Sequence, residues 1–98
     1  MKTEGKNIKM FYGDFGISLP INITNVLETD VIKFRIYNIL NELKIEKELP
    51  YENERWILQF AEEESKELIK GQYWYEVVQY RNGVLQNTIN KGASFEVE

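Results

Sequence analysis

Apolar and polar residues alternate along most of this chain, which is the pattern of short β-strands that bury one face. The clearest alternation runs through residues 17–24, and Pro20 within it has no amide hydrogen to donate. This strand is therefore expected at a sheet edge or at a bulge. Three other segments alternate in the same way, residues 7–12, 31–37 and 55–60. The polar segment before them, residues 1–6, is predicted to be frayed.

The segment from residue 39 to residue 48 fits two structures. Several of its apolar residues have helical spacing, whereas residues 44–49 alternate as a strand does. We favour the strand, because the neighbouring segments are strands.

A short helix is predicted at residues 62–69, after a loop at residues 50–54. Glu62 and Lys66 are one helical turn apart, and acidic residues occupy the end where the helix dipole is positive. Gly71 is predicted to end this helix as its C-cap.

Residues 68–80 form the most aromatic segment and predict a strand that is entered through Gly71. Alternation divides its side chains between two faces: Tyr73, Tyr75 and Val77 on one, and Trp74, Glu76, Val78 and Tyr80 on the other. Asn82-Gly83 follows directly, and this pair is the strongest short signal for a two-residue hairpin turn. The chain is then expected to return along residues 84–90, to form a bulge or kink at Lys91-Gly92 and to end in a strand at residues 93–97.

This pattern amounts to seven or eight short strands, with turns at regular spacing and one short helix. It favours an all-β sandwich, and a barrel is the main alternative. We expect one domain, residues 1–98, and a full-length small protein because the chain begins with Met1. The expected core contains Phe34, Trp56, Tyr73, Tyr75, Val77 and Phe95.

Composition narrows the function classes. The net charge is −4 and the basic residues are scattered among glutamates, which argues against a nucleic-acid partner. The chain has no cysteine and no histidine, so disulfides, serine–histidine or cysteine–histidine catalysis and histidine-ligated zinc are excluded. No signal peptide or membrane-spanning run is present, so we expect neither secretion by the ordinary route nor a membrane partner.

The segment Leu68-x-x-Gly71-x-Tyr73, preceded by an acidic helix and followed by a hairpin, resembles a corner of fibronectin type III and other immunoglobulin-like domains. In those domains a tyrosine hydroxyl bonds to an upstream backbone group. The resemblance implies an immunoglobulin-like sandwich in which Leu68, Gly71 and Tyr73 form this structural corner.

A longer series of motifs is similar to small immunoglobulin-like domains encoded by phages and prophages of low-GC Gram-positive bacteria. In chain order the motifs are Gly13-Asp14 with the strand at 17–23, Asp30–Ile36, Ile45–Leu49, Leu68–Tyr75 and Thr88–Val97. The last one departs from the pattern, since Ala93-Ser94 places one extra residue between Gly92 and Phe95. That family is similar to the N-terminal domain of baseplate and tail-tip proteins that attach receptor-binding parts. The resemblance implies a structural, assembly or attachment role without catalytic residues or cofactors, in a virion or in the cytoplasm before assembly.

The candidate interaction surface is the strand face that carries Trp74 and Tyr80, together with Val78. Exposed aromatic patches mark contact surfaces, so a protein partner or self-association is expected there. Cover by a neighbouring loop is an equally good interpretation of the same face. The second functional hypothesis is a carbohydrate-binding module that stacks sugars on these rings.

Carboxylate chemistry is the remaining candidate. Glu62, Glu63 and Glu64 with Asp14, Glu28 and Asp30 could suggest calcium, but their spacing matches no EF-hand loop and the helix dipole accounts for the glutamates. A hydrolase with paired carboxylates needs a cleft, and a domain this small offers little. We therefore predict no metal site, no cofactor and no enzymatic activity.

Overall fold

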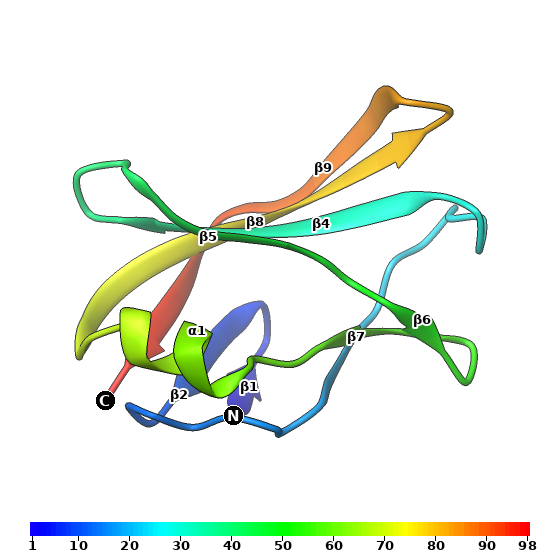
Figure 1. The fold of residues 1–98 in the computed structure, drawn as a ribbon. Helices are drawn as coiled ribbons and strands as arrows, with labels where there is room; N and C mark the ends of the chain where they lie inside the picture. Colours follow the sequence, from blue (N-terminus) through cyan, green and yellow to red (C-terminus); the bar gives the residue numbers. More distant parts are fainter.

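Two β-sheets and one short helix make up the computed structural model, which describes all 98 residues (Figure 1). The larger sheet has six strands in the order β1 (Lys2–Glu4), β2 (Asn7–Met10), β9 (Val84–Val97), β8 (Gly71–Arg81), β4 (Val31–Asn38) and β5 (Leu43–Glu48). The smaller sheet has three strands in the order β3 (Leu19–Ile21), β7 (Arg55–Leu58) and β6 (Tyr51–Glu52). Helix α1 (Glu62–Glu67) precedes β8. All strand pairs are antiparallel except β2 with β9, which are parallel.

The two sheets pack around one hydrophobic core, which is compatible with the predicted all-β sandwich. The six predicted core residues Phe34, Trp56, Tyr73, Tyr75, Val77 and Phe95 are all buried, as expected. Phe34 stacks on Tyr75 with ring centroids 4.8 Å apart, and Phe95 meets both rings edge-on. Offset and edge-to-face aromatic contacts of this kind add specificity to apolar burial. The core is therefore centred on strands β4, β8 and β9.

Two predictions of irregular chain are wrong. Residues 2–4 form a hairpin with β2 instead of fraying, and residues 51–52 form a hairpin with β7 inside the predicted loop. The second hairpin turns through Asn53 and Glu54, which both have positive φ. The strands of both hairpins that were missed, β1 and β6, are exposed on every residue, so neither has the alternation of a half-buried strand.

Within the ambiguous segment at residues 39–48, residues 43–48 form a strand, as favoured. Ile45 and Leu49 are buried, and β5 pairs along β4 from Leu43 to Glu48. Ile39 and Leu40, which gave the segment its helical spacing, lie exposed in the turn. The Pro20 prediction is also confirmed, because β3 is an edge strand that pairs only with β7.

The corner that leads into β8 differs from the prediction at Gly71. The helix ends at Glu67 with Leu68 as its C-cap, so Gly71 does not cap it and instead begins β8. Leu68 is fully buried, and burial of this side chain directs the chain into the core before the strand starts. The Tyr73 hydroxyl donates to the Ile69 carbonyl at 2.8 Å, which is the bond that the resemblance implies for this residue.

The β8–β9 hairpin follows the predicted turn chemistry. Asn82 and Gly83 both have positive φ, as a type I′ turn requires. The bulge or kink expected at Lys91-Gly92 is a bulge, because the pairing register shifts between Tyr75 and Val77, opposite the Asn90–Gly92 segment. β9 continues through this bulge as a single strand.

We predict that Tyr73→Phe lowers the free energy of unfolding by about 1 kcal/mol, because it removes one hydrogen bond at a buried corner. Urea denaturation measures this change. Tyr12→Phe is the matched control, since Tyr12 is 46% exposed and should tolerate the loss of its hydroxyl. Equal stability of the two variants would contradict a stabilising role for the corner bond.

Candidate interaction face

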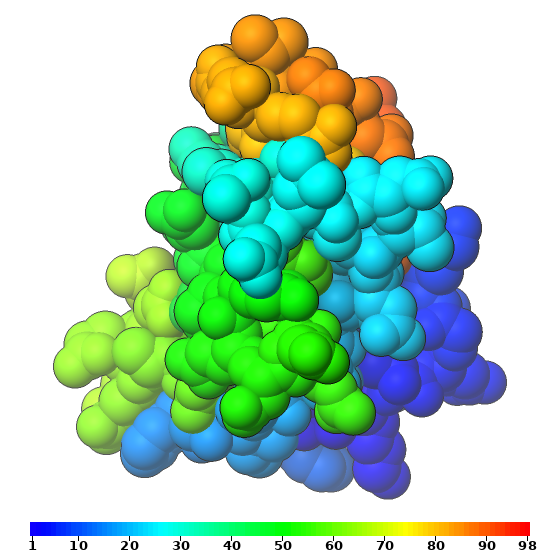
Figure 2. All heavy atoms as spheres, turned by 90° about the vertical axis from the view of Figure 1, so that its right-hand side faces the viewer, coloured from blue at the N-terminus to red at the C-terminus, as the bar shows by residue number.

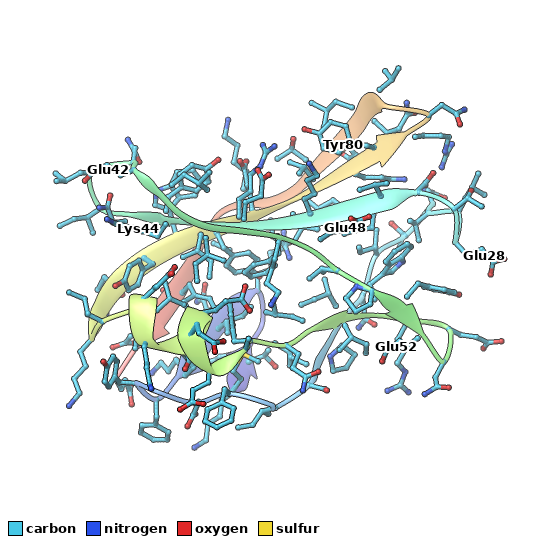
Figure 3. The ribbon with its side chains drawn as sticks, viewed as in Figure 1. Glu28, Glu42, Lys44, Glu48, Glu52 and Tyr80 are labelled. Atoms are coloured by element: carbon cyan, nitrogen blue, oxygen red, sulfur yellow. The ribbon has the colours of Figure 1, made fainter.

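The outer face of the six-stranded sheet, on the side away from the smaller sheet, carries a connected group of polar and aromatic side chains (Figure 3). We call it the outer-face cluster, and it consists of Arg35, Tyr37, Glu46, Trp74, Glu76 and Tyr80. These residues come from β4, β5 and β8. The continuous pairing of β4 with β8 sets Arg35 opposite Glu76 and Tyr37 opposite Trp74.

The aromatic half of the cluster is a stacked pair. The rings of Tyr37 and Trp74 lie 4.1 Å apart with an interplanar angle of 11°. The indole Nε1 of Trp74 donates to the Asn41 side chain at 3.0 Å, from the turn between β4 and β5. Trp74 is thus fixed by one ring and one turn residue, and it remains partly exposed.

The charged half of the cluster is centred on Arg35. Its Nε donates to Glu46 at 2.7 Å, and its Nη2 donates to the Tyr80 hydroxyl at 3.2 Å. Its Nη1 lies 3.9 Å from the carboxylate of Glu76, which also accepts a 2.9 Å bond from the Tyr37 hydroxyl. Glu76 is only 8% exposed, so these donors compensate for the burial of its charge.

Burial raises the pKa of the Tyr37 hydroxyl above its ordinary value, and the hydrogen bond to Glu76 raises it further. The hydroxyl therefore stays protonated and continues to donate across the neutral pH range. The charged and hydroxyl groups of the cluster are bonded to one another, so the cluster forms a fixed surface.

The structure separates the three residues predicted to form the interaction surface. Trp74 packs with Tyr37, whereas Tyr80 contacts Arg35 and lies 5.6 Å below the ammonium group of Lys33. Val78 lies between them in the strand and is 2% exposed, so it offers no surface to a partner. The surface presented to solvent is built from Trp74 and Tyr80 with residues of the neighbouring strands.

Sequence analysis missed Arg35, Tyr37, Glu46 and Glu76. Alternation along residues 31–37 predicts one buried and one outward face, and on the outward face Arg35 and Tyr37 are partly buried. The sequence does contain a sign of this cluster, because Arg35 and Tyr37 alternate with the buried residues Phe34 and Ile36 along the strand. It could be interpreted only with the register that sets Arg35 against Glu76.

A second polar cluster, also absent from the sequence predictions, fixes the loop before β4. Arg81 donates twice to the Asp30 carboxylate at 2.9 Å, and Gln79 and the Leu27 amide donate to it at 2.9 Å. The hydrogen bonds from Arg81 hold the pKa of Asp30 far below its ordinary value. The cluster ties the β3–β4 loop to the end of β8.

The structure contains no group of three or more aspartates and glutamates that could hold a metal ion. The largest hollow, about 540 Å³, lies between β1, β2 and the C-terminus, and its Glu98 is paired with Lys9 at 3.9 Å. The outer-face cluster lines neither this hollow nor the four others described by their lining residues.

Comparison with known proteins found no matching family model, and no curated protein or solved structure with significant similarity. The one helix has six residues, and no helix is long and apolar enough to cross a membrane.

We predict that Trp74→Ala lowers the free energy of unfolding by roughly 1–2 kcal/mol, because it removes one aromatic stack and one hydrogen bond. Trp56→Ala, at a buried core position, should cost roughly 3–5 kcal/mol. Urea denaturation of both variants provides the comparison. An equal loss at the two positions would show that Trp74 is a core residue and not part of a contact surface.

We predict that Asp30 makes stability depend on pH in the acid range. Since its folded pKa is lowered, its contribution is complete above the unfolded pKa of about 4 and is lost as pH falls through the folded pKa. Asp30→Asn should therefore be less stable than the wild type at pH 7, and the difference should shrink toward pH 2. Urea denaturation at several pH values measures this difference, and a difference that stays constant would rule out the proposed linkage.

Proposed function

We propose that this chain is a non-enzymatic immunoglobulin-like interaction module that binds a protein partner through the outer-face cluster. The observation that carries the proposal is the association of Trp74, Tyr37, Tyr80 and Arg35 on an open sheet face. Tryptophan, tyrosine and arginine are the residue types that supply most of the energy at protein interfaces.

The rigidity of the cluster supports the same proposal. Arg35 and Trp74 are each held by two or more neighbours before any partner arrives. Side chains that are already ordered lose little conformational entropy on binding, so more of the contact energy contributes to affinity. A flexible solvated arginine on a bare sheet would lack this advantage.

The strand order supports the immunoglobulin-like part of the proposal. In immunoglobulin domains the third, sixth and seventh strands are neighbours in one sheet, and the second and fifth are neighbours in the other. Strands β4, β8 and β9 would correspond to the first set, and β3 and β7 to the second. The Tyr73 hydroxyl bonds to the Ile69 carbonyl near the start of β8, and the tyrosine corner of such domains occurs near the start of the corresponding sixth strand.

The proposal extends to a phage or prophage protein, as a tail- or baseplate-associated assembly or attachment domain. Its support is the series of sequence motifs that resemble that family. Two of them, Asp30–Ile36 and Ile45–Leu49, largely coincide with the neighbouring strands β4 and β5, which carry half of the outer-face cluster. An attachment role needs a stable surface and no reactive group, and the cluster has this character.

Carbohydrate binding is the second candidate, and one observation favours it. Tyr37 covers one face of the Trp74 ring, while the opposite neighbour of Trp74 on β9 is Ser94. A serine side chain is too short to cover an indole ring, so this side of Trp74 is available to a sugar.

The products of the genes that flank this one are the partners to test first. We predict that Trp74→Ala and Arg35→Ala each weaken the binding of a copurifying product by at least about 30-fold, as expected for central interface residues. Lys66→Ala, at an exposed helix position, is the control and should bind like the wild type. Titration calorimetry measures the affinities, and unchanged binding by both cluster variants would refute the proposed surface.

Titration of tryptophan fluorescence with cell-wall polysaccharides separates the two candidates. A protein-binding module should give no saturable change. A saturable change that disappears in Trp74→Ala would favour the carbohydrate-binding module.

A further inference from the structure

The edges of the two sheets are protected in different ways, and one long edge has neither charge nor proline. A sheet edge exposes unpaired N–H and C=O groups that can pair with another strand, so edges are commonly short or carry charges or proline. β3 contains Pro20, β6 has two residues, and β1 consists of Lys2, Thr3 and Glu4. β5 carries Lys44, Glu46, Lys47 and Glu48 along its free edge.

The edge without charge or proline is the first half of β9, where one bulge at Gln86 interrupts the register with β8. β2 pairs with β9 only from Phe95 to Val97, so residues 84–92 have β8 on one side and no strand on the other. The sequence from Val84 to Asn90 is Val-Leu-Gln-Asn-Thr-Ile-Asn, without charge, proline or glycine. Val84 and Leu85 are 60% and 53% exposed. We call this segment the free edge, and it forms the projecting end of the hairpin in Figures 1 and 2.

We propose that the free edge pairs antiparallel with the same segment of a second copy, so that two six-stranded sheets join into one continuous sheet. In a two-fold arrangement each segment meets itself, and every cross-strand pair between residues 84 and 90 joins neutral side chains. No like charges oppose each other in any register, which is not true of β5 or β1.

The flanking charge selects the antiparallel direction. Lys91 follows the free edge directly. Parallel pairing of two copies would set the two Lys91 side chains next to each other, whereas antiparallel pairing centred on Asn87 sets each one opposite the Gly83 turn of the other copy. Arg81, at the other end of the hairpin, is neutralised within its own copy by Asp30.

The expected association is weak. A seven-residue strand is about 24 Å long, and one added strand pair buries less area than a standard protein interface. A dissociation constant on the order of 100 µM is therefore expected. The pairing uses the edge of β9 and not the outer-face cluster, so it does not depend on the proposed partner-binding surface.

Charge insertion tests the proposal with a closely matched control. Thr88→Lys places a charge at an exposed position of the free edge, and Thr3→Lys makes the same change on the exposed edge strand β1. Dimerisation is measured by sedimentation equilibrium from about 10 µM to about 1 mM. Thr88→Lys should weaken it roughly tenfold or more, because each of the two paired strands then carries an added positive charge at the interface. Thr3→Lys and Trp74→Ala should dimerise like the wild type.

Gln86→Lys is the second free-edge variant, and thermal unfolding verifies that each variant is folded.

Amide hydrogen exchange supplies the structural part of the test. In the wild type, amides within residues 84–90 should exchange more slowly as the concentration rises, while those of residues 2–4 should not change. A wild type that remains monomeric at about 1 mM would overturn the proposal. Dimerisation that survives both free-edge substitutions, or that is lost equally in Thr3→Lys, would also overturn it.

Discussion

The pairing of β4 with β8 is the constraint on which the rest of the structure depends. The register is continuous from Val31 opposite Tyr80 to Asn38 opposite Tyr73. It places Phe34 and Tyr75 together in the core, and it places Arg35 and Glu76 together on the outside. Because side chains alternate between the faces of a sheet, a shift of one residue would send the core residues of either strand into solvent. Core packing and the outer-face cluster are therefore specified by the same register.

The outcome of the sequence predictions follows from this geometry. The alternation of apolar and polar residues is a property of a single strand, so it identified the core positions of β8. The Asn82-Gly83 pair is likewise a local signal, and it identified the turn. The outer-face cluster depends on which residue of β4 faces which residue of β8, and alternation contains no information about register. The Asp30–Arg81 pair was out of reach for the same reason, since 51 residues separate its members. The β1 and β6 strands were missed because every residue in them is exposed, so their sequences show no alternation of apolar and polar residues.

Two surfaces of the sheet have different physical characters. The outer-face cluster offers fixed side chains, and a partner would be selected by the shape and charge of Trp74, Arg35 and Tyr80. The free edge offers backbone groups, which pair with little regard to sequence unless charges prevent it. Specificity would thus come from the face, and the edge would determine how many copies present that face together. A pair of copies that present the same face would strengthen a weak contact through avidity.

The parallel pairing of β2 with β9 has a consequence for how the chain acquires its structure. The Tyr12 amide donates to the Glu98 carbonyl, and the Glu98 amide donates to the Met10 carbonyl. Strand β2 therefore has no partner on that side until residues 95–98 have been synthesised. Contacts between such distant parts of a chain carry a large loop-closure cost and slow the search for the folded state. During that interval Ile8 and Met10, both buried in the finished fold, remain exposed to solvent and to any chaperone that binds apolar segments.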